Sequence, residues 1–138
     1  MGAAFGNDHR QAATSAGFIK VRDGESMRIR VLRIFPVENV PESRTPNGAF
    51  DVVPMDVHVT SHSAQGAIND QRRWEPAADK IDGLIKLADD LERDSGNERA
   101  IYEVDVDVDV TGERNPKTGR TYHVYTYTVA SGAATARP

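Results

Sequence analysis

The sequence predicts a mainly β domain of five strands, with one α-helix between the third and fourth strands. In several stretches apolar residues alternate with polar ones, as in strands that bury one face. One later stretch instead repeats its apolar residues at helical spacing. The chain has 138 residues, of which 38% are hydrophobic and 28% charged, the length of one domain. We expect that domain over residues 17–130, with flexible segments at 1–16 and 131–138, which are polar and lack periodicity.

The first two strands are predicted from alternation on either side of a proline-containing loop. The first lies within residues 18–35, which a turn at Asp23–Gly24 interrupts, and there Arg28 and Arg30 face away from the apolar side chains. The second lies within residues 53–60. The apolar faces of the two strands consist of Met27, Ile29, Val31, Val53, Met55, Val57 and Val59. One face of this sheet is therefore expected to form the core, and part of the other to be cationic.

A short third strand ends at Trp74, and the helix follows it. Residues 61–69 are polar and predict a loop before residues 71–74 complete the strand. Glu75 and Pro76 open the helix, because proline is tolerated in the first turn, and Gly96 ends it. Its apolar residues are Ile81, Leu84, Ile85, Ala88 and Leu91. We expect this amphipathic helix to cover a core at one end of the sheet or barrel.

The last two strands form a long hairpin over residues 101–129. Valines alternate with carboxylates up to residue 110, and residues 121–129 are rich in β-branched and aromatic side chains. The connection carries Asn115–Pro116 and Thr118–Gly119, both strong turn signals. This hairpin is expected to have a basic tip.

Charge is distributed unevenly along the chain. The formal net charge is -4, which by itself argues against a nucleic-acid binder. However, residues 75–110 hold twelve acidic and four basic residues, whereas residues 1–74 hold eight and nine, and residues 111–138 hold one and four. Two segments are therefore free to form basic surfaces.

Arginines beside aromatic residues indicate a surface for single-stranded nucleic acid. Arginine donates paired hydrogen bonds to phosphate, and aromatic rings stack on unpaired bases. The candidate binding residues are Arg28, Arg30, Arg72, Arg73, Trp74, Arg114, Lys117, Arg120, Tyr125 and Tyr127. The alternatives are a solvated strand face for the strand arginines, a solvated turn for the hairpin cations, and core packing for the aromatic residues.

The carboxylates Glu103, Asp105, Asp107 and Asp109 lie along one face of a single predicted strand. A divalent metal needs carboxylates that converge on one point, which an extended strand cannot supply alone. We prefer three other readings of these carboxylates: an acidic face paired with an arginine-bearing strand, a partner-binding patch, or protection against edge pairing. A metal-dependent enzyme is a further hypothesis.

No sequence motif indicates an enzyme. The chain has no cysteine, which excludes thiolate metal sites and cysteine nucleophiles. It also lacks the common hydrolase, phosphate-binding and dinucleotide-binding motifs. We expect no catalytic residue, no metal and no cofactor. The sequence has no signal peptide and no apolar run of membrane-spanning length, so we expect a cytoplasmic protein without a membrane partner.

Three stretches carry a resemblance to a family: DGESMRIRVL at 23–32, RRWEPAADKIDGLIKLADDL at 72–91, and GERNPKTGRTYHVYTYTV at 112–129. Together with the order of the elements, they make the chain resemble the OB-fold single-stranded DNA-binding proteins of bacteriophages. The resemblance implies an OB-like five-stranded Greek-key barrel that coats single-stranded DNA without catalysis or sequence preference. It also implies a role in DNA replication or recombination in the host cytoplasm, with proteins of those processes as partners, and leaves a homo-oligomer open. The alternative function is a protein-interaction or virion-associated β-domain that uses the acidic strand as its contact surface.

Overall fold

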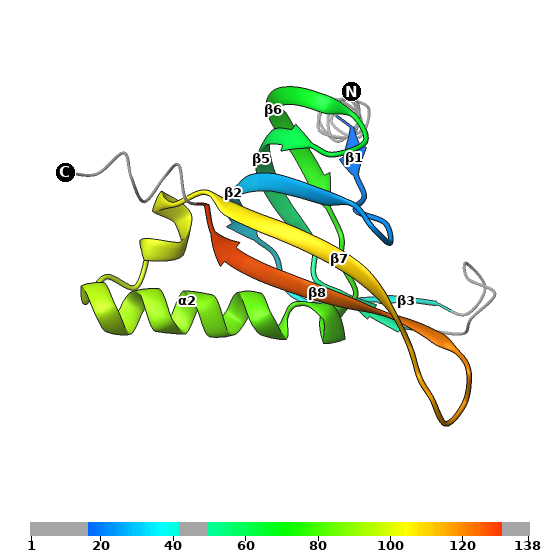
Figure 1. The fold of residues 1–138 in the computed structure, drawn as a ribbon. Helices are drawn as coiled ribbons and strands as arrows, with labels where there is room; N and C mark the ends of the chain where they lie inside the picture. Colours follow the sequence, from blue (N-terminus) through cyan, green and yellow to red (C-terminus); the bar gives the residue numbers. More distant parts are fainter. Residues whose placement is uncertain (1–16, 42–49, 131–138) are drawn as a thin grey trace, which may run out of the picture.

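The computed structural model describes residues 17–41 and 50–130 (Figure 1). The two flexible segments predicted at 1–16 and 131–138 lie outside these residues. The described residues form a six-stranded sheet that curls, a small two-stranded sheet and one α-helix. The predicted mainly β fold with one helix is therefore confirmed.

The curled sheet has the strand order β1-β6-β5-β2-β7-β8. Its neighbouring strands are antiparallel except for β1 and β6, which run parallel. Its strands are β1 (Phe18–Ile19), β2 (Ser26–Ile34), β5 (Met55–His62), β6 (Gly66–Trp74), β7 (Val106–Arg114) and β8 (Thr121–Val129). The small sheet pairs β3 (Glu38–Val40) with β4 (Phe50–Val52).

The core lies on the concave side of the curled sheet, between the sheet and the helix. Alternate residues of β2, β5 and β7 are almost completely buried, as the alternation of the sequence predicted. They are Met27, Ile29, Val31, Met55, Val57, Val59, Val106, Val108 and Val110. The residues between them point outward because successive strand side chains face opposite sides. The sequence pattern therefore fixes which charged residues are available on the outer surface.

The helix α2 spans Asp82–Ser95 and lies along β8 (Figure 1). Gly96 ends it, as predicted: this residue has φ 71°, and its N–H donates to the Glu92 carbonyl at 2.7 Å. The predicted start at Glu75 and Pro76 is wrong. The chain there instead makes a β-bridge between Val52 and Ala77 and then a short 3-10 helix, Ala78–Lys80.

The number of strands and the position of the helix differ from the prediction. The described residues contain eight strands, and α2 lies between β6 and β7 rather than after a third strand. The extra strands β1, β3 and β4 have two or three residues each, which is too short to leave a periodic signal. A second 3-10 helix, Ala100–Glu103, occupies the start of the hairpin that was predicted from residue 101. No helix in the described ranges has the length and apolar content needed to cross a membrane.

Candidate nucleic-acid interface

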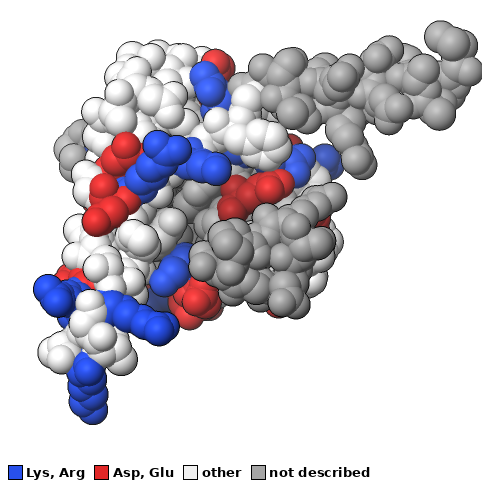
Figure 2. Space-filling view, turned by 90° about the vertical axis from the view of Figure 1, so that its right-hand side faces the viewer, with Lys and Arg blue, Asp and Glu red and all other residues white. Residues whose placement is uncertain are grey.

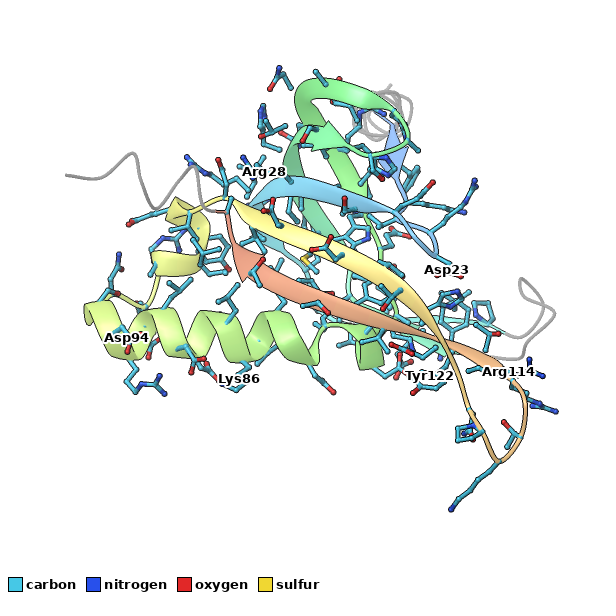
Figure 3. The ribbon with its side chains drawn as sticks, in the orientation of Figure 1. Asp23, Arg28, Lys86, Asp94, Arg114 and Tyr122 are labelled. Atoms are coloured by element: carbon cyan, nitrogen blue, oxygen red, sulfur yellow. The ribbon has the colours of Figure 1, made fainter. Side chains whose placement is uncertain are left out.

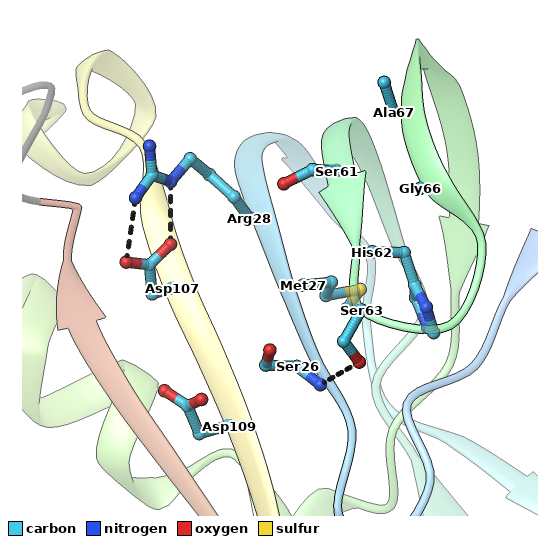
Figure 4. A pocket seen from close by; sticks show the side chains of 10 residues that line it. All are labelled: Ser26, Met27, Arg28, Ser61, His62, Ser63, Gly66, Ala67, Asp107 and Asp109. Atoms are coloured by element: carbon cyan, nitrogen blue, oxygen red, sulfur yellow. Dashed lines mark hydrogen bonds and ion pairs between the residues drawn. The ribbon is translucent and has the colours of Figure 1, made fainter.

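Arg28 and Arg30 lie on the outer face of β2, where each is bound to a carboxylate near or on β7. Arg28 donates from Nε and Nη2 to the two carboxylate oxygens of Asp107 at 2.8 and 3.2 Å (Figure 4). Arg30 Nε donates to Asp105 Oδ1 at 3.0 Å. The hydrogen bond and the charge of Asp107 raise the pKa of the Arg28 guanidinium. The acidic face is therefore paired with an arginine-bearing strand, and much of the charge of both is compensated within the sheet.

Arg72 and Arg73 are also paired, and they point to opposite faces of β6 because they are adjacent in a strand. Arg73 Nε donates to Asp56 Oδ1 on the neighbouring strand at 3.1 Å, and its guanidinium carbon lies 4.6 Å from the centre of the Phe35 ring. Arg72 Nε donates to Asp70 Oδ1 at 2.7 Å. The structure therefore does not bring the four strand arginines together as one unpaired cationic face.

Trp74 and Tyr127 pack in the core. Their exposed fractions are 3% and 8%, and their ring centres are 6.3 Å apart with the planes tilted by 50°. The Tyr127 hydroxyl donates to the Lys80 carbonyl at 2.8 Å, and burial raises the pKa of this tyrosine well above its ordinary value. Core packing, the alternative that the sequence left open, thus describes these two residues, and neither ring has a free face on which a base can stack.

Tyr125 is the candidate aromatic residue of β8 that stays partly accessible. It points to the same side of the strand as Tyr127, but lies closer to the tip and is only half buried, which raises its pKa. Tyr122, on the opposite side of the strand, is 48% exposed. The side of β8 that carries Tyr125 and Tyr127 is therefore the core side, a question that the sequence alone could not decide.

The hairpin tip is the set Arg114, Lys117 and Arg120, all three exposed. No ion pair joins any of them to a carboxylate within the described ranges. The turn itself is ordered by hydrogen bonds, since Asn115 Oδ1 accepts from the Lys117 N–H at 2.9 Å and Asn115 N–H donates to the Arg120 carbonyl at 2.9 Å. In Figures 1 and 3 the tip extends away from the body of the sheet. A defined turn thus presents three accessible cations.

A shallow depression of about 440 Å³ lies on the outer face beside the Arg28–Asp107 pair (Figure 4). Three serines, Ser26, Ser61 and Ser63, contribute to its lining together with the exposed carboxylate of Asp109. Within residues 17–41 and 50–130, no group of three or more His, Asp or Glu side chains is arranged to hold a metal ion. The hypothesis of a metal-dependent enzyme therefore has no support from these residues.

Two accessible aromatic residues near the short strands β1 and β4 are not among the binding residues predicted from the sequence. Phe18 and Phe50 are 49% and 41% exposed, and Lys20 and Arg22 are also exposed. All four line one pocket. In the sequence, the signal for a site here was one aromatic residue, Phe18, followed by the cations Lys20 and Arg22. Alternation assigned this stretch to a strand and did not indicate a pocket.

Comparison with known proteins gives no match: no family model fits the chain, and neither a curated protein nor a solved structure resembles it significantly.

Proposed function

We propose that this protein binds single-stranded DNA without catalysis and with little sequence preference, and that it acts in DNA replication or recombination. The observation that carries the proposal is the hairpin tip, because three exposed cations on an ordered, projecting turn are suited to phosphate contacts. Phosphate contacts carry no sequence information. We also propose that the sheet forms an OB-like barrel like that of bacteriophage single-stranded DNA-binding proteins. Its partners would be replication or recombination proteins.

The topology supports the OB-like part of the proposal. The antiparallel strands β7-β2-β5-β6 lie side by side in that order, and β7 returns to the first strand of the set after the helix. A fourth strand beside the first is also a feature of a Greek key, and this arrangement supports the proposal. The sheet curls but leaves β1 and β8 as its two edges, in keeping with a partly open barrel, an architecture that binds oligonucleotides.

The distribution of charge over the molecule supports the hairpin tip as the contact with DNA. Figure 2 looks onto the side that carries the tip, and Lys and Arg side chains project from its lower end. The carboxylate at the end of α2 lies elsewhere: Figure 3 places Asp94 on the side of the molecule opposite Arg114. Asp82, at the start of the helix, lies nearer β8, where its charge acts on Tyr127. A strand bound at the tip would therefore lie away from the carboxylate at the end of the helix, with little electrostatic repulsion from it.

The alternative function, protein interaction through the acidic strand, has less support. Asp105 and Asp107 already have arginine partners at 3.0 and 2.8 Å. Asp109 remains exposed, and Glu103 lies in a 3-10 helix rather than in the strand. The four carboxylates thus do not form one continuous unpaired surface for a partner, and we favour DNA binding.

Fluorescence anisotropy with a labelled oligothymidylate tests the proposal, with a duplex as the competing substrate. We expect micromolar or tighter binding to the single strand at low salt and weaker binding to the duplex, whose bases are stacked on one another and cannot stack on aromatic side chains. Equal affinity for the two substrates, or no binding at low salt, would contradict the proposed function.

A further inference from the structure

We infer that a pocket at the seam of the curled sheet receives one unstacked base of the bound strand, an inference that rests on the proposed function. This seam pocket has a volume of about 320 Å³ and lies between the two edge strands. Phe18 lines it from β1, Phe50 from β4 and Tyr125 from β8. Pockets for small molecules start at about 300 Å³, so the seam pocket suits one base rather than a folded peptide.

The walls of the seam pocket are held by contacts between segments distant in sequence. The bridge between Val52 and Ala77, and the hydrogen bond from Val53 N–H to the Pro76 carbonyl at 3.0 Å, fix β4 against the chain that follows β6. On the opposite edge, β1 is paired with the end of β6. The buried Trp74 also lines the pocket. The site is therefore assembled by the fold and exists before a ligand arrives.

Aromatic rings give the seam pocket its stacking surface. Phe18 and Phe50 keep 49% and 41% of their surface exposed, and Tyr125 is partly buried against the core. Single exposed hydrophobic residues are common on proteins, whereas a cluster in a concavity marks a binding site. Flat rings from three strands offer faces and edges to a planar ligand, and base–aromatic stacking tolerates any base.

Charge at the seam pocket favours a nucleotide over an uncharged planar ligand. Lys20 and Arg22 line it, and neither makes an ion pair with a carboxylate in the described part of the chain. Glu75 is the one carboxylate among the described lining residues, and its Oε2 lies 3.8 Å from Arg73 Nη1. The rim therefore pairs stacking rings with cations, as a base with its attached phosphate requires.

The seam pocket and the hairpin tip lie on one path. Tyr125 follows Arg120 by five residues, and a strand rises about 3.4 Å per residue, so β8 carries a path of about 17 Å from tip to pocket. One continuous single strand can therefore place phosphates at the tip and a base in the seam pocket. A duplex holds its bases stacked inside and cannot do so without paying to flip one out.

The experiment uses Trp74, the only tryptophan of the chain, as a reporter placed in the wall of the seam pocket. Unlabelled oligothymidylate is titrated while tryptophan emission is recorded, and anisotropy with labelled strand measures affinity separately. A strand of the same length with abasic sites keeps the phosphates but has no base to insert. We expect thymidylate to change the Trp74 emission, and the abasic strand to bind more weakly with no such change.

Two variants test whether the aromatic residues of the seam pocket contribute to single-strand affinity. Phe18→Ala and Phe50→Ala are each expected to weaken single-strand affinity about 5- to 150-fold, the equivalent of one lost stacked base, with the salt dependence unchanged. The control is Leu32→Ala, which removes a side chain that is 42% exposed and does not line the seam pocket. It should bind as the parent does. Thermal melts by circular dichroism verify that all three variants fold.

The outcomes separate this inference from the function on which it rests. If the strand binds but the Trp74 emission does not respond, and both phenylalanine variants bind as the parent does, the seam pocket is overturned while the proposed function stands. If no single strand binds at low salt, the proposed function fails and the inference falls with it.

Discussion

Leu84 and Ile85 are neighbours in α2, yet only Leu84 reaches the core: their exposed fractions are 2% and 50%. We expect Leu84→Ala to lower the free energy of unfolding by about 2–5 kcal/mol, because it removes buried methyl groups and leaves a cavity. Ile85→Ala should change it by less than about 0.5 kcal/mol. Urea unfolding of the two variants measures the difference, and equal losses would show that the helix does not pack as described.

Tyr127 makes stability dependent on alkaline pH. Burial raises its pKa in the folded state above its ordinary value of about 10. Above pH 10 the unfolded chain therefore loses a proton that the folded protein retains, and stability falls as pH rises toward the folded-state pKa. The expected slope is at most about 1.4 kcal/mol per pH unit for this residue. Below pH 10 its contribution is constant.

Two variants isolate this effect in urea unfolding followed over the alkaline range. Tyr127→Phe cannot ionise, so its loss of stability above pH 10 should be shallower than that of the parent, although at neutral pH it lacks the hydrogen bond to the Lys80 carbonyl and should be less stable by about 1 kcal/mol. Tyr122→Phe, at a residue 48% exposed, should keep the parental slope. Identical slopes in parent and Tyr127→Phe would refute the linkage.

A variant of the carboxylates on β7 and just before it tests whether the acidic face takes part in DNA binding. Replacing Asp105, Asp107 and Asp109 together by Asn removes three negative charges and releases Arg28 and Arg30 from their partners. Single-strand affinity should stay equal or increase, because fewer negative charges repel phosphate less. Stability should fall by no more than about 1 kcal/mol per ion pair, since these side chains are about a third exposed.

Anisotropy titrations of the Asn variant, with and without a divalent cation, provide the measurement. If affinity disappears while the fold is kept, and parental binding proves to need a metal ion, the acidic strand is functional and a metal-dependent activity takes first place.

Long elements were predictable from sequence, whereas short and long-range features were not. Alternation identified the buried faces of β2, β5 and β7, because period-two burial is a local property. The two residues of β1 pair with β6 more than fifty positions away, and no local pattern encodes that partner. The predicted loop at 61–69 is mostly strand for the same reason: polar β6 residues pair with β5 without being buried.

In the candidate site, as in the fold, local features were predictable from the sequence and long-range contacts were not. The exposure of the hairpin tip follows from its turn residues, which are local. The pairing of the acidic face with an arginine-bearing strand was among the readings expected from the sequence. The individual partners of Arg28 and Arg73 were not, because Asp107 and Asp56 lie 79 and 17 positions away. The seam pocket depends on three strands meeting, so only the tertiary structure reveals it.

Taken as a whole, the molecule separates its charges. Arg114 of the hairpin tip lies on one side of the molecule, and Asp94 at the end of the acidic helix α2 lies on the opposite side (Figure 3). This polarity lets a protein with a net charge of -4 attract a polyanion at one surface, because ions screen repulsion from charges more than about 10 Å away. Under the proposed function, affinity for DNA therefore depends on where the cations lie and not on how many there are.

The salt dependence of single-strand affinity tests this account most directly. The tip variant replaces Arg114, Lys117 and Arg120 by Ser. The helix variant replaces Lys86, Arg93 and Arg99 by Ser, in or near the acidic helix. Each variant loses three cations, so their net charges are equal. We predict that the tip variant binds every sequence more weakly and that its slope of log affinity against log salt is flatter by about 2, or roughly 0.7 per lost contact. The helix variant should keep the parental slope. Parental slopes in both variants, or equal losses in both, would contradict binding through the hairpin tip.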